Sequence, residues 1–92
     1  IAALLAGIHM GIEHKLSAPT PISGNAWLED DETPPLPSHM GTAISQFSTS
    51  QAVRDYLSEP FQMAFTAVKT QELVEFETRV TDFELETYLA SP

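Results

Sequence analysis

The chain opens with a segment, residues 1–16, that is apolar on almost every face of a helix. Its large apolar side chains recur at three- and four-residue steps, at Ile1, Leu4, Leu5, Ile8, Ile12 and Leu16. Small alanines, Ala2, Ala3 and Ala6, fill much of the remaining surface. A helix that is apolar all round is typical of a buried element. The segment therefore predicts a helix over residues 1–16 that other parts of a protein must cover.

A membrane or secretory role for this segment is disfavoured by its length and flanks. A span needs about 20 apolar residues, and a signal peptide begins with a basic leader. Here polar His9, Glu13 and His14 interrupt or follow the apolar run. A small secreted or membrane-associated helical protein is therefore the weakest interpretation. The start at Ile1, apolar and without a cap, indicates a chain cut from something longer.

Size and charge narrow the classes of partner. Ninety-two residues make at most one small domain, which is marginally stable alone. Thirteen acidic residues against four basic ones give a net charge of −9. Nucleic acids and anionic membranes require a positive surface, so we expect neither as a partner. There is no cysteine, which excludes disulfides and thiol chemistry and suits a cytoplasmic protein.

Residues 17–37 are predicted to form a long extended connection. Five of the seven prolines lie here, Pro19, Pro21, Pro34, Pro35 and Pro37. Proline removes an amide donor and disfavours helix at the preceding residue. Ser23-Gly24-Asn25 predicts a turn, and the acidic run 29–32 is expected to face water. A loop of this length is uncommon unless it lies along a neighbour or serves a site.

Helical patterns resume after Ser38. Two short helices are predicted within residues 38–57, and Ser50 is a suitable N-cap for the second. Ser58 is expected to cap a longer helix over residues 59–80, with Pro60 tolerated in its first turn. The apolar residues of the short helices are Ala43, Ile44, Phe47, Val53, Tyr56 and Leu57.

The long helix is predicted to bury one stripe and to carry an ion pair between Glu75 and Arg79. The members of that stripe are Phe61, Ala64, Phe65, Val68, Phe76 and Val80. Thr81 and Glu84 fit a capping box that opens a last helix over residues 82–89. No segment alternates as a strand does. The predicted fold class is all-α.

Few residues suggest chemistry. His9 and Glu13 lie one helical turn apart and could share a metal ion, but no third ligand is placed beside them. His14 and His39 are isolated. Neither a G-x-S-x-G elbow nor a glycine-rich phosphate loop is present in the sequence. The residues themselves predict a helical packing module with no catalytic, cofactor-binding or metal-binding residue.

The order of several segments resembles the end of the glutamine synthetase family, closest to its γ-glutamylputrescine (γ-glutamyl-polyamine) synthetase branch. The resemblance covers essentially the whole chain in register. Its segments are GIEHKL (11–16), PTPISGNA (19–26), LP (36–37), RDYLSEPF (54–61), KTQELVEFE (69–77) and VTDFE (80–84) continuing through Tyr88 and Leu89.

This resemblance implies that residues 1–92 are the C-terminal helical part of an α+β catalytic domain. The parent would be a cytoplasmic ligase that uses ATP and Mg or Mn to form a γ-glutamyl phosphate, which ammonia or a polyamine then attacks. The ligands of ATP and metal would lie upstream of this chain, which alone would be inactive. Its partners would be the remainder of the catalytic domain and neighbouring subunits of a homo-oligomer.

Two departures refine the resemblance. Family members regulated by adenylylation carry a tyrosine where this chain has Trp27, whose indole has no hydroxyl to modify. We therefore expect no nucleotidylation in the loop, and a packing role for Trp27. The spacing of Gly7 and Gly11 is more similar to the polyamine branch. The alternative interpretation is a free-standing acidic helical module that binds other proteins.

Overall fold

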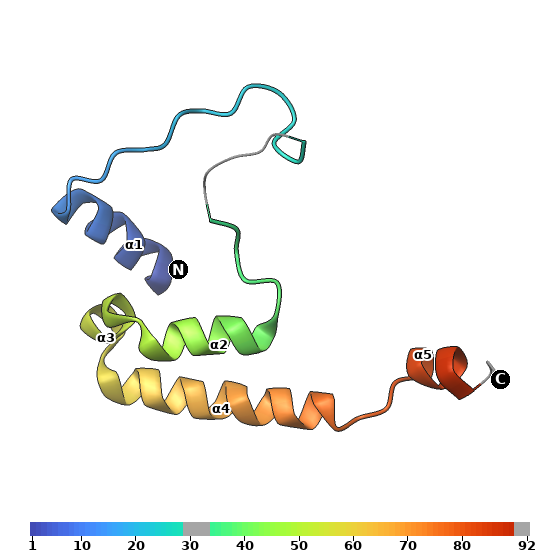
Figure 1. Ribbon diagram of the computed structural model, residues 1–92. Helices are drawn as coiled ribbons and strands as arrows, with labels where there is room; N and C mark the ends of the chain where they lie inside the picture. The colour runs from blue at the N-terminus through green and yellow to red at the C-terminus, as the bar shows by residue number, and fades with distance from the viewer. Residues whose placement is uncertain (29–33, 90–92) are drawn as a thin grey trace. The chain divides into compact units, whose positions relative to one another are not determined.

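The computed structural model describes residues 1–28 and 34–89 (Figure 1). The helices are α1 (Ala2–Glu13), α2 (Met40–Thr49), α3 (Gln51–Leu57), α4 (Glu59–Glu77) and α5 (Asp82–Glu84), followed by a π-helical turn η1 (Leu85–Leu89). No strand occurs in the described ranges, and the all-α prediction is confirmed. The chain forms two compact units, residues 1–36 and 37–92. The acidic run 29–32 lies outside the described residues.

Helix α1 ends earlier than the predicted residue 16, because Lys15 takes a left-handed backbone conformation with φ of 51°. The Leu16 N–H donates to Gly11 O (3.0 Å) and the Lys15 N–H to Ile12 O (3.2 Å). This pair of bonds is the Schellman arrangement, which satisfies carbonyls at a helix end. Glycine normally holds the left-handed position, so the sequence carried no signal for this end.

The connection after α1 contains the predicted turn. Gly24 has a φ of 100°, which an L side chain rarely adopts. The Trp27 N–H donates to Asn25 Oδ1 (3.0 Å), and the Leu28 N–H donates to Asn25 O (3.0 Å). Trp27 is 95 % exposed in this chain. Its role in packing the loop onto the helices of the parent protein stays a prediction.

Helices α2, α3 and α4 form an antiparallel hairpin with α3 at its bend (Figure 1). The predicted caps are present: Ser50 Oγ accepts from the Val53 N–H (3.2 Å), and Ser58 Oγ accepts from the Phe61 N–H (3.4 Å). Ser58 separates α3 from α4 with φ of 78° and ψ of 152°. Such a conformation costs a non-glycine residue about 1–3 kcal/mol. Surrounding contacts must therefore hold this bend.

Gln62 supplies those contacts and is the one fully buried residue in the described part of the chain, at 2 % exposure. Its Nε2 donates to Phe47 O (2.8 Å) and to Ser50 O (2.9 Å), which lie at the end of α2. Its Oε1 accepts from Arg54 Nε of α3 (3.3 Å). One side chain of α4 thus joins all three helices.

The buried stripe predicted for the long helix is wrong. Its members are all exposed, with Phe65 the least at 40 % and Phe76 the most at 69 % among its large residues. The face turned inward instead carries Gln62, Thr66, Lys69 and Leu73. Each helical residue turns by about 100°, so the bonds of Gln62 fix a rotation that leaves the most apolar stripe exposed, although Phe65 still contacts Phe47 of α2.

The ends of the long helix also differ from the prediction. Helix α4 ends at Glu77, three residues before the predicted residue 80. Arg79 is therefore not on the helix, and the predicted ion pair with Glu75 does not form in the described residues. The Glu75 carboxylate accepts from Gln71 Nε2 instead (3.3 Å).

The predicted capping box opens α5. The Thr81 N–H donates to Glu84 Oε2 (2.7 Å), and the Glu84 N–H donates to Thr81 Oγ1 (3.3 Å). The Thr81 N–H, followed by the Thr81 hydroxyl, lowers the pKa of the Glu84 carboxyl. Both bonds favour the ionised carboxylate.

Replacing Gln62 by alanine should loosen the hairpin, because the carbonyls of Phe47 and Ser50 lose their buried donor. We expect a loss of about 1–3 kcal/mol, seen as reduced helicity in circular dichroism and faster amide exchange in α2 and α3. Gln71→Ala is the matched control, since Gln71 is an exposed glutamine of the same helix. Equal helicity in the two variants would contradict the role given to Gln62.

The capping box should depend on pH. Because the folded-state pKa of Glu84 is lowered, its stabilisation is present above the unfolded pKa and is lost as pH falls through the folded pKa. An NMR titration should place the Glu84 midpoint below that of an unstructured glutamate. Thr81→Val removes the hydroxyl bond and should raise the midpoint. A Glu84 midpoint equal to that of a free glutamate would show that the box does not form.

Candidate functional site

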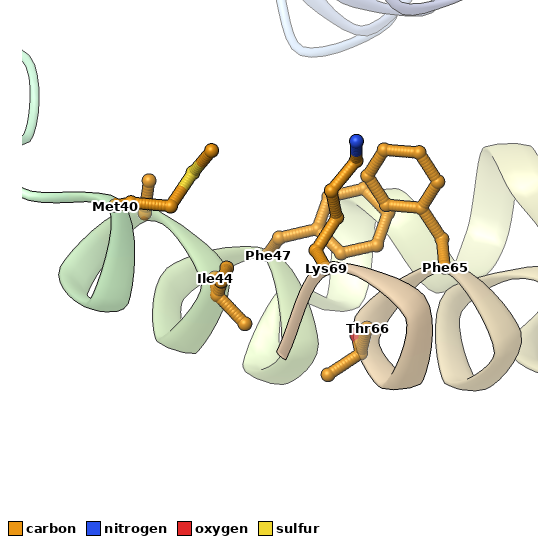
Figure 2. A pocket seen from close by; sticks show the side chains of 7 residues that line it. Met40, Ile44, Phe47, Phe65, Thr66 and Lys69 are labelled. Atoms are coloured by element: carbon orange, nitrogen blue, oxygen red, sulfur yellow. The ribbon is translucent and has the colours of Figure 1, made fainter. Parts of the chain in front are cut away.

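The candidate site is a surface groove rather than a reaction centre. Helices α2 and α4 enclose it, with a volume of about 290 Å³. We call it the α2–α4 groove, and its lining consists of Met40, Ala43, Ile44, Phe47, Phe65, Thr66 and Lys69 (Figure 2). Most of these side chains are hydrocarbon, so the groove favours apolar occupants.

Aromatic rings pack against one another at one end of the groove. The rings of Phe47 and Phe65 lie side by side (Figure 2), with centroids 5.1 Å apart at an angle of 51°. Phe61 stacks on Phe65 with a centroid distance of 5.7 Å. Such offset and tilted pairs are the arrangements that aromatic rings prefer. The three rings therefore hold one another in place although they remain partly exposed.

Lys69 forms the charged rim of the groove. Its Nζ lies 5.5 Å from the centroid of the Phe65 ring and 2.8 Å from Glu72 Oε2. The ammonium is thus paired with a carboxylate and placed over an aromatic ring, an arrangement that is favourable to a cation. Thr66 Oγ1 is buried and has no hydrogen-bond partner in the described part of the chain.

A second, wider hollow of about 890 Å³ continues from Met40 toward the end of α4. Its lining includes Gly41 of α2 together with Leu73, Phe76 and Glu77 of α4. Met40 lines both spaces. The two hollows therefore adjoin at Met40.

The two possible metal ligands on α1, His9 and Glu13, lie near each other without a third ligand in the described residues. His9 Nε2 lies 3.9 Å from Glu13 Oε1, and these side chains are 62 % and 63 % exposed. Within residues 1–28 and 34–89, no group of three or more His, Cys, Asp or Glu side chains converges. His14 and His39 are not brought into such a group. No described helix is long and apolar enough to cross a membrane.

Exposed apolar surface is the dominant property of both units. Across the described residues no hydrophobic side chain is fully buried. On α1, Leu4 is 73 % and Ile12 70 % exposed, and on α4, Met63 is 66 % exposed. Large exposed apolar patches are typical of surfaces that contact other protein or a ligand.

Sequence reasoning identified the apolar residues of this surface but not the groove. Ala43, Ile44 and Phe47 recur at helical spacing and lie half-buried along α2. The helical spacing predicts Phe65 in a buried stripe, whereas it forms an exposed wall of the groove. The helical spacing of Met40 with Ala43, Ile44 and Phe47 was the available signal for a second apolar face.

Residues 1–88 match the catalytic domain of glutamine synthetase. The chain is also 33 % identical over 89 residues to gamma-glutamylputrescine synthetase PuuA of Escherichia coli (strain K12). That match covers 97 % of this chain and 18 % of the relative, so the chain spans about a fifth of the relative's length. No solved structure matches significantly. The chain belongs to the glutamine synthetase family and corresponds to a helical part of its catalytic domain.

Proposed function

We propose that this chain is a packing and assembly element of an ATP-dependent glutamate–amine ligase. The observation that carries the proposal is the absence of a fully buried hydrophobic side chain in the described residues of a chain that matches a catalytic domain over residues 1–88. Burial of apolar surface is the main force that stabilises a fold. These helices would obtain it from the rest of the domain and from neighbouring subunits.

The basic residues of the chain support a structural role. Binding ATP requires cations or free amide groups directed at phosphates. Two of the four basic residues in the sequence are engaged within the chain, since Arg54 donates to buried Gln62 and Lys69 pairs with Glu72. We propose that the groups that bind ATP and Mg or Mn belong to the parent protein outside this chain.

The amine substrate is proposed from the relative. Its name specifies γ-glutamylputrescine synthesis, and the segment around Gly7 and Gly11 resembles the polyamine branch. We therefore propose putrescine or another polyamine, rather than ammonia, as the better acceptor. We also propose that the loop is not nucleotidylated at position 27, since the indole of Trp27 carries no hydroxyl.

The experiment uses the full-length protein that contains this chain. Phe76→Ala should destabilise the protein or dissociate its subunits, at a cost of about 3–5 kcal/mol if the ring is fully buried there. Thr70→Ala, on the exposed surface of the same helix, is the control. Thermal unfolding and sedimentation measure the loss, while assembled Phe76→Ala enzyme should keep its affinity for ATP.

The same preparation tests the reaction through phosphate release with ATP, glutamate and each amine. Release should be greater with a polyamine than with ammonia. An assembled and stable Phe76→Ala enzyme that cannot bind ATP would contradict the structural role. Ammonia outperforming every polyamine would remove the proposed acceptor and leave the structural role standing.

A further inference from the structure

We draw no further inference here: the strongest candidate, the apolar groove between α2 and α4 that Met40, Phe47 and Phe65 line, carries none because nothing in the structure shows what covers it.

Discussion

The hairpin depends on the hydrogen bonds of one buried amide. Gln62 lies on α4. Its amide donates to the carbonyls of Phe47 and Ser50 at the end of α2 and accepts from the guanidinium of Arg54 on α3. Buried polar groups are costly unless they are satisfied, and here each group of the amide has a partner. The same bonds fix the bend at Ser58, whose backbone conformation would otherwise be unfavourable for serine.

Fixing the bend also fixes which surface remains uncovered. With Gln62 inward, α4 turns Thr66, Lys69 and Leu73 toward α2 and leaves Phe65 and Phe76 at the surface. A polar anchor inside and aromatic rings outside reverse the arrangement of a self-sufficient domain. The chain spans about a fifth of its relative's length. A larger protein can bury the exposed rings of Phe65 and Phe76, which would account for this arrangement.

Local signals predicted much of the fold from the sequence. Ser50, Ser58 and the Thr81–Glu84 box act where the cap pattern placed them, because capping depends on a few neighbouring residues. The inward face of α4 could not be predicted, since it depends on bonds between Gln62 and carbonyls more than ten residues away. The α2–α4 groove could not be predicted either, because hydrophobic spacing identifies an apolar face but not the neighbour that covers it.

The central claim is that these helices are completed by protein outside the chain, and amide hydrogen exchange tests it most directly. The 92-residue chain and the full-length protein are compared over α1, where no residue is buried in the chain itself. The account predicts fast exchange in the isolated chain and strong protection of α1 amides in the full-length protein. Equal, strong protection of α1 in both would contradict it.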